Sequence, residues 1–182
     1  MALPNNAKLV FKGVMFDVYQ WEQVQFDGSY KTFEAVKRKE SVQLIAITPE
    51  KNILLLEEEQ PFLGKYLSLV GGICESDDPR DDAIRELGEE TGMVCEDLEF
   101  WQITGFSAKV IWNTTYFIAR GCKKAIDIHL DAGERISVFE LSFDEFVQKV
   151  LSDSFRNKEF ANMVLKMIYE NKLDEFKQFL LK

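Results

Sequence analysis

A short helix with both ends marked in the sequence, set directly after a group of β-type runs, most constrains how this chain can fold. Apolar β-type runs occupy residues 41–48, 52–59 and 66–70, and turn residues separate the first two. The third run ends at the glycine pair Gly71–Gly72. Short apolar runs bounded in this way are typical of strands in a buried sheet. We therefore expect a sheet that leads straight into the helix.

The predicted helix begins near Pro79 and ends near Thr91. Asp77 or Asp78 can accept a hydrogen bond from an N–H group of the first turn, and a proline fits that turn because it has no N–H to lose. Gly92 then ends the helix, because glycine readily takes the left-handed conformation found there.

Similar patterns predict the remaining elements. Asp27–Gly28 is a hairpin-turn signal in the N-terminal third, and Ser142 with Glu145 forms a capping box near the C-terminus. Strands embedding a helix, with further helices at the end, predict an α/β fold of mixed layers. The further strands are expected over 8–26, 31–40, 98–107, 114–121 and 135–141, and the further helices over 142–151, 159–171 and 173–182.

Composition excludes several classes of protein. The 182 residues suit one domain with a small appendage, and 46% are hydrophobic. A net charge of −9 argues against a broad nucleic-acid-binding surface, which needs clustered Lys and Arg. No apolar run approaches the length of a membrane span. Cys74, Cys95 and Cys122 are odd in number and no signal peptide precedes them, so we expect a soluble, cytoplasmic protein with reduced thiols.

The helix is unusually acidic on one side. Glu86, Glu89 and Glu90 lie at helical spacings of three and four, so they share a face, and Asp82 extends this stripe by one turn. Like charges at these spacings cost a few tenths of a kcal/mol per pair, roughly. A solvated surface that tolerates this cost is the simplest interpretation. The predicted apolar face consists of Ala83, Ile84 and Leu87.

The setting of the stripe favours a metal site instead. The pair Gly71–Gly72 permits a tight turn close to a ligand, and Gly92 bounds the helix. Clustered carboxylate oxygens suit Mg²⁺ or Mn²⁺. A diphosphate substrate would supply the remaining oxygen ligands.

Residues 71–93, GGICESDDPRDDAIRELGEETGM, resemble the Nudix box, G-x5-E-x7-R-E-U-x-E-E-x-G-U with U aliphatic. Counted from Gly71, the motif departs from the pattern only at the first acid, where Asp77 replaces Glu. If Gly72 is taken as the box glycine, the loop is one residue short and Asp77 or Asp78 stands in for the first acid.

The resemblance extends to the ADP-ribose pyrophosphatase branch of that family, on residues 41–72 and 133–146. It implies a Nudix-type α/β/α sandwich with a mixed central sheet and an N-terminal β-hairpin region. Residues 1–40 would then form a dimerisation and substrate-pocket element, and residues 41–182 the catalytic domain of a homodimer.

The resemblance also implies roles within the box. Carboxylates of the helix and one backbone carbonyl would hold Mg²⁺ or Mn²⁺, which polarises phosphoryl oxygens and activates water. Arg85 would orient a glutamate rather than touch substrate. The implied ligands are Glu86, Glu89, Glu90 and the carbonyl of Gly71 or Gly72.

Candidates outside the box are less specific. The resemblance implies that Glu134, or the neighbouring Asp131, is the general base. Arg38 and Lys37 are candidate pyrophosphate contacts, and His129 is expected to be a surface or structural histidine rather than a catalyst. Aromatic side chains of the hairpin region could stack on a base or pack a dimer, namely Trp21, Phe26, Tyr30 and Phe33.

These features predict a metal-dependent hydrolase that splits a nucleoside diphosphate derivative, ADP-ribose or an ADP-sugar, into AMP and a sugar phosphate. A hydrolase of nucleoside triphosphates or dinucleotide cofactors, a Nudix-fold module that binds nucleotide without cleaving it, and a structural protein with an acidic helix are the alternatives. Neither nucleic acid nor membrane is an expected partner.

Overall fold

The computed structural model describes residues 3–107, 109–130, 133 and 135–182. The strands are β1 Lys8–Lys12, β2 Asp17–Val24, β3 Tyr30–Lys37, β4 Ser41–Ile47, β5 Ile53–Gln60, β6 Gly64–Ser68, β7 Met93–Val94, β8 Asp97–Ser107, β9 Val110–Arg120, β10 Lys123–Lys124 and β11 Arg135–Leu141. The helices are α1 Pro79–Thr91, α2 Phe143–Val150, α3 Lys158–Tyr169 and α4 Leu173–Leu180. Among the described residues, strands β1–β6 precede helix α1, strands β7–β11 follow it, and helices α2–α4 come last, much as the sequence predicts.

One mixed sheet of nine strands organises the molecule. Its main path runs β1-β2-β3-β9-β4-β5-β11, with β6 paired to β5 and β8 paired to β9. Strand β9 is parallel to both β3 and β4, whereas the other pairs are antiparallel. Strands β7 and β10 form a separate small ladder.

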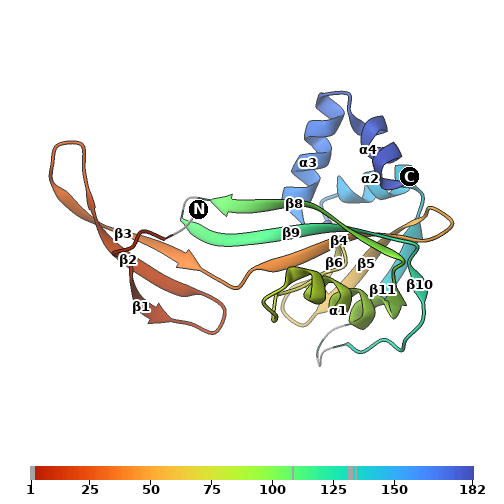
Figure 1. Cartoon of the computed structure of the whole chain (residues 1–182), viewed down its shortest axis with the longest axis horizontal. Helices are drawn as coiled ribbons and strands as arrows, with labels where there is room; N and C mark the ends of the chain where they lie inside the picture. Colours follow the sequence, from red (N-terminus) through yellow and green to blue (C-terminus); the bar gives the residue numbers. More distant parts are fainter. Residues whose placement is uncertain (1–2, 108, 131–132, 134) are drawn as a thin grey trace.

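Helices cover both faces of this sheet (Figure 1). Helix α1 lies on one face, over a core cluster that includes Leu44, Leu54 and Leu87. Helices α2, α3 and α4 cover the other face, where Phe146 and Phe160 are fully buried. Alternate residues of each central strand therefore enter different cores, as the period of two requires. The predicted α/β/α sandwich with a mixed sheet is confirmed.

The sheet opens between β4 and β5, and this opening positions the site. The two strands share only the pair Ile47–Ile53. Beyond it, the segment after β6 fills the gap and forms bridges from Val70 to Leu44 and from Ile73 to Ser41. This segment carries the paired glycines, so the opening brings them between the sheet and α1.

Helix α1 begins and ends where the sequence predicts. The Asp78 side chain accepts from the N–H of Arg80, Pro79 occupies the first turn, and Gly92 ends the helix with a φ of 68°. The predicted apolar face is wrong at one position, because Ile84 is 50% exposed. Ala83 and Leu87 are buried as predicted, and Glu86 and Glu90 are largely buried beside them, toward the opening in the sheet.

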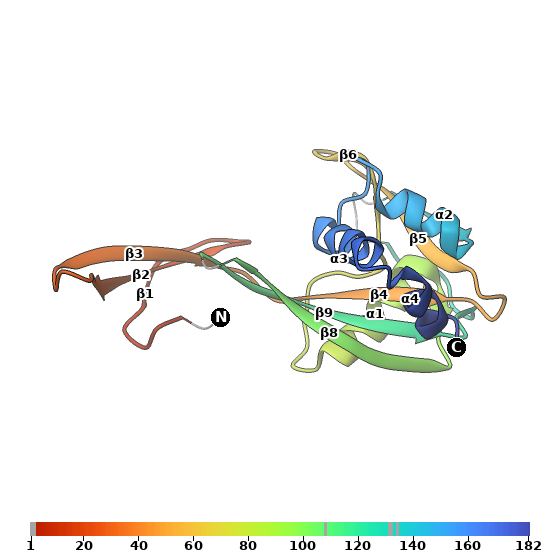
Figure 2. The same cartoon turned by 90° about the horizontal axis from the view of Figure 1, so that it is seen from above.

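Strands β1, β2 and β3 project away from the body, as Figures 1 and 2 show from two directions. The predicted hairpin around Asp27–Gly28 is confirmed, since β2 and β3 pair along their whole length. Large apolar side chains on this projection are exposed, among them Phe11 at 61% and Tyr30 at 67%.

Two sequence expectations concern the chain as a whole. The cysteines Cys74, Cys95 and Cys122 are free. Within the part of the chain that the structure describes, no helix combines the length and the apolar character needed to cross a membrane.

Candidate active site

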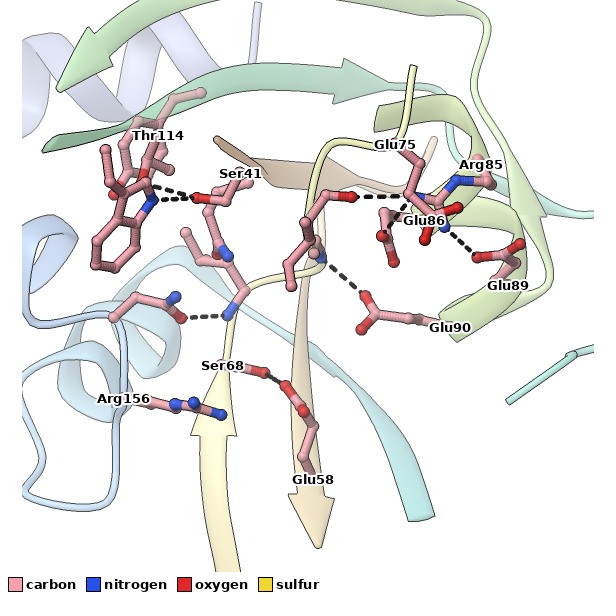
Figure 3. A pocket seen from close by; sticks show the side chains of 18 of the residues that line it. Ser41, Glu58, Ser68, Glu75, Arg85, Glu86, Glu89, Glu90, Thr114 and Arg156 are labelled. Atoms are coloured by element: carbon pink, nitrogen blue, oxygen red, sulfur yellow. Dashed lines mark hydrogen bonds and ion pairs between the residues drawn. The ribbon is translucent and has the colours of Figure 1, made fainter. Parts of the chain in front are cut away.

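A cavity of about 700 Å³ lies at the opening in the sheet. Helix α1 and the glycine segment form its acidic wall, and β4, β9 and the residues before α3 form the opposite wall. Figure 3 shows Glu86, Glu89 and Glu90 on one side, with Ser41 and Thr114 on the other. A pocket of this size accommodates a nucleotide-sized ligand.

Predicted metal ligands from α1 all line this cavity. Glu86 and Glu90 are largely buried, at 9% and 8% exposure, whereas Glu89 is half-buried. A carboxylate oxygen of Glu90 accepts from the backbone N–H of Gly71 at 2.8 Å. The acidic stripe is therefore a cavity wall rather than a solvated surface.

Arg85 gathers the neighbouring carboxylates. Its guanidinium donates to Glu89 at 2.6 Å, to Glu86 at 2.8 Å and to Asp82 at 3.2 Å. It also donates to the backbone carbonyl of Ile73. Burial alone would lower the pKa of Arg85, but its acidic neighbours outweigh burial and raise that pKa, so the side chain stays charged.

Asp82 holds the loop before the helix and is almost completely buried, at 2% exposure. Its carboxylate accepts from the N–H groups of Glu75 and Ser76 and from the Ser76 hydroxyl, besides Arg85. Burial alone raises the pKa of this carboxyl, but these hydrogen bonds outweigh it and hold the pKa below its usual value. Asp82 thus connects the glycine segment to the acidic helix.

Both glycines are required by close contacts. Gly71 has a φ of 144°, and a Cβ on it would lie 2.2 Å from the carbonyl oxygen of Val42. A Cβ on Gly72 would lie 2.2 Å from a carboxylate oxygen of Glu86. One glycine lets the segment pack against β4, and the other leaves room for a predicted metal ligand.

A polar network faces α1 across the cavity. Glu58, on β5, accepts hydrogen bonds from the hydroxyls of Ser68 and Tyr66. The Tyr66 hydroxyl accepts in turn from Arg156 at 2.7 Å. Burial and the Glu58 carboxylate raise the pKa of Tyr66, so it remains a protonated donor. This network fixes one arginine and one more carboxylate on the cavity wall.

Arg38 lies further along the same wall. Its guanidinium is stacked 4.3 Å from the ring centre of Trp112. Burial, and then the charge of Arg156, lowers the pKa of Arg38. Within the described part of the chain no acidic side chain forms an ion pair with Arg38, so this cation is available for an anion from outside the chain.

The carboxylate oxygens in this cavity are of the chemical type that binds a divalent cation. Carboxylates of Glu75, Glu86, Glu89 and Glu90 line one wall of the cavity beside Gly71, and hard oxygen ligands of this type are those that Mg²⁺ and Mn²⁺ bind. Among the described residues, no three His, Cys, Asp or Glu side chains already converge on one point. To bind an ion, Glu86 and Glu89 would have to turn away from Arg85, from which both accept hydrogen bonds.

Other predicted residues have different outcomes. Glu134 and Asp131 lie outside the described residues. Trp21 lies on β2, where its indole N–H donates to Gln23, and it is not among the described residues that line the cavity. His129, predicted to be a surface or structural histidine, is exposed at the edge of the cavity, and its backbone N–H donates to the carbonyl of Glu89.

Sequence reasoning missed several residues of this cavity. Glu58 had a weak signal, since it lies in an acidic run at the end of a predicted strand. Arg156 had no signal in the sequence. It lies beside β6 because its backbone N–H donates to the carbonyl of Leu67, a contact between distant segments. Other wall residues that pattern alone did not suggest include Ser41, Gln43, Ser68, Trp112, Thr114 and Glu159.

Comparisons with known proteins agree with this geometry. The model of the NUDIX domain family matches residues 37–162. The chain is 34% identical over 132 residues to the methanol dehydrogenase activator of Bacillus methanolicus, covering 68% of this chain and 69% of that protein. It is 28% identical over 145 residues to the ADP-ribose pyrophosphatase of Bacillus subtilis (strain 168), covering 76% of this chain and 71% of that protein.

The fold is also similar to a solved structure. The crystal structure of an ADP compounds hydrolase superposes with a TM-score of 0.73, covering 92% of this chain and 95% of that chain at 16% identity. The family model spans the glycine segment, the acidic helix and both walls of the cavity from Arg38 to Glu159. This chain therefore belongs to the Nudix family and is a Nudix hydrolase.

Proposed function

We propose that this Nudix hydrolase cleaves the pyrophosphate linkage of a nucleoside diphosphate derivative, ADP-ribose or an ADP-sugar, to AMP and a sugar phosphate. The observation that carries the proposal is one cavity that holds a cluster of carboxylates on α1 and two arginines opposite them. Carboxylates of α1 line one wall, and Arg38 and Arg156 line the other. The names of the Bacillus subtilis relative and of the structural neighbour support the same substrate class.

The two walls would divide the work of hydrolysis. Glu86, Glu89 and Glu90 would hold Mg²⁺ or Mn²⁺, which when bound neutralises charge on the diphosphate and lowers the pKa of a water molecule. Arg38 and Arg156 would bind phosphate oxygens and orient the linkage, since guanidinium groups match phosphate geometry.

Arg85 and one acid of the following loop would complete the machinery. When Glu86 and Glu89 turn to the metal, Arg85 keeps its contact with Asp82 and limits how far the two glutamates move. Glu134, or Asp131 in its place, would take the proton of the attacking water as the P–O bond to the leaving phosphate breaks.

Incubation with ADP-ribose and Mg²⁺ should release AMP and ribose 5-phosphate in equal amounts. Chromatography of the nucleotides measures the products. A panel containing ADP-glucose, NADH, diadenosine polyphosphates and nucleoside triphosphates ranks the alternatives by kcat/KM. Turnover of triphosphates or dinucleotides alone would contradict the proposed substrate, and binding of ADP-ribose without product would favour a non-catalytic module.

We also propose that residues 1–40 form a dimerisation element attached to a catalytic domain of residues 41–182. Exposed apolar side chains on the projecting strands support this, including Leu9 at 46% and Val24 at 57% exposure. A second copy of the chain would cover them and could bring Trp21 to the cavity. Light scattering should give twice the chain mass, and deletion of residues 1–37 should give a monomer. A monomeric mass for the full chain would contradict this arrangement.

The cytoplasm is the proposed location. The cysteines Cys74, Cys95 and Cys122 support it because they are free, as thiols remain in a reducing compartment.

A further inference from the structure

Two buried polar atoms in the cavity lack the partners that folded proteins usually provide. In the residues that the structure describes, the buried side-chain nitrogen and oxygen atoms without a hydrogen bond are Nε of Arg38 and Oε1 of Gln43. Both residues line the same cavity. Buried polar atoms are nearly always paired in folded proteins, because an unpaired one keeps its desolvation cost. A pair of exceptions in one cavity indicates a ligand that supplies both partners.

Gln43 lies on the wall of the cavity opposite α1. The register of β4 and β9 places Ser41 opposite Thr114 and Gln43 opposite Tyr116. Residues two apart on a strand point to the same side, so Ser41 and Gln43 share this wall. Figure 3 shows Ser41 and Thr114 on this side, across the cavity from Glu89.

The polar neighbours of Gln43 form hydrogen bonds with one another, and these bonds do not include Gln43. The indole N–H of Trp112 donates to the Ser41 hydroxyl at 2.9 Å, and the hydroxyls of Ser41 and Thr114 lie 3.0 Å apart. Glu159 brings a second acceptor to this wall, and the Thr104 hydroxyl donates to it at 3.2 Å. Burial raises the pKa of the Glu159 carboxyl. This end of the cavity therefore offers hydrogen-bond acceptors to a ligand.

The two unpaired atoms require different chemistry. Arg38 can only donate, and a phosphate oxygen satisfies it. Phosphate oxygens are acceptors, however, and cannot satisfy Oε1 of Gln43, which requires an O–H or N–H group. A sugar phosphate carries both groups close together, because its hydroxyls lie a few bonds from its phosphate.

We propose that Gln43 is a specificity residue that accepts a hydrogen bond from a hydroxyl of the sugar attached to the diphosphate. Gln43, together with Glu159 on the same wall, makes this wall a sugar subsite, and Arg38 binds the adjoining phosphate. The inference deepens the proposed function and rests on it, since it names the group on one side of the cleaved linkage.

Equilibrium binding without divalent metal tests the subsite separately from catalysis. Ligand-observed NMR in EDTA gives dissociation constants for ribose 5-phosphate and for inorganic phosphate. The wild-type protein should bind ribose 5-phosphate about tenfold more tightly than phosphate, as expected when a buried acceptor gains its partner. Gln43→Met should lose this tenfold preference and bind inorganic phosphate as before.

A matched variant and a stability measurement separate a binding role from a structural one. Gln60→Met removes another glutamine of the same cavity, at the end of β5, and should keep the preference for ribose 5-phosphate. Gln43→Met should unfold at the same temperature as the wild type or higher, because it removes an unpaired polar group.

Three results would overturn the subsite. Equal affinity of the wild type for both ligands is one, and full retention of the preference in Gln43→Met is another. The third combines two observations: the wild type binds AMP more tightly than IMP and Gln43→Met does not, while ribose 5-phosphate binds no more tightly than phosphate. Gln43 would then accept a hydrogen bond from the amino group of a base rather than from a sugar. Failure of the proposed hydrolysis would appear only in the product assay, because these measurements contain no metal.

Discussion

Glu89→Gln and Glu90→Gln should each reduce kcat for ADP-ribose by about 10³-fold. The proposed ligands hold the cation that stabilises charge on the phosphoryl oxygens, an effect of several kcal/mol, and each 1.36 kcal/mol corresponds to a factor of ten in rate. Glutamine preserves the shape of the side chain but removes its charge. Steady-state assays at saturating Mg²⁺ measure the change.

The fold should survive both substitutions. The amide oxygen of Gln at position 90 can still accept from the N–H of Gly71, and Arg85 keeps Asp82 and Glu86 when residue 89 loses its charge. Unchanged melting in EDTA would confirm this. Glu140→Gln is the matched control, because Glu140 is exposed on β11 and does not line the cavity.

Melting temperature also reports the metal directly. A cation that binds only the folded protein adds about 2.7 kcal/mol at one hundred times its dissociation constant. Mg²⁺ or Mn²⁺ should therefore raise the melting temperature of the wild type and of Glu140→Gln, and should raise it less in Glu89→Gln and Glu90→Gln. Near-normal turnover in both glutamine variants, or an equal metal effect in all four proteins, would contradict the metal site.

The acidic helix could be predicted because its signals are local. Asp78 and Pro79 mark the start of the helix and Gly92 marks its end, and each signal depends only on residues nearby in the sequence. Helical spacing alone places Glu86 and Glu90 together. Spacing cannot tell which side of a helix enters the core. Ala83 and Leu87 enter the core as the sequence suggested, but Ile84 is exposed, and the opening between β4 and β5 buries Glu86 and Glu90 as well.

Apart from Arg38, the opposite wall could not be predicted, because distant segments assemble it. Arg156 reaches Tyr66 through a loop held against β6, and Glu58 becomes part of a network only when β5 and β6 pair. Trp112 meets Ser41 through the parallel pairing of β4 with β9, across 71 residues of sequence. The residue pattern within a single segment cannot predict contacts between segments that are far apart in the sequence.

Asp82 is the residue whose loss should most destabilise the fold around the site. Its buried carboxylate accepts from the N–H groups of Glu75 and Ser76 and from Arg85. Asp82→Ala leaves these donors unpaired and should cost about 3–5 kcal/mol, the range for breaking a buried ion pair. At roughly 2–4 °C per kcal/mol for a chain of this size, the melting temperature should fall by about 6–20 °C. Calorimetry at pH 7 measures the difference.

The difference in stability between the wild type and Asp82→Ala should disappear at acid pH, because the pKa of Asp82 is lower in the folded protein than in the unfolded chain. Hydrogen bonds hold the pKa of the folded carboxyl below its unfolded value of about 3.9. The stabilisation is therefore complete above that value and is lost as the pH falls through the lower, folded pKa. Urea unfolding of the wild type and Asp82→Ala should give free energies that differ by a constant amount above about pH 5 and converge below about pH 4.

The adjacent Asp81 provides the control for this effect. Asp81 is exposed in the first turn of α1, where a carboxylate contributes about 0.3–1 kcal/mol through the helix dipole. Asp81→Ala should therefore cost less than about 1 kcal/mol at pH 7. If Asp82→Ala cost no more than Asp81→Ala, the carboxylate would not be holding the glycine segment against the helix. Arg85 would then be the contact that positions Glu86 and Glu89, and Arg85→Lys should produce the larger loss of stability.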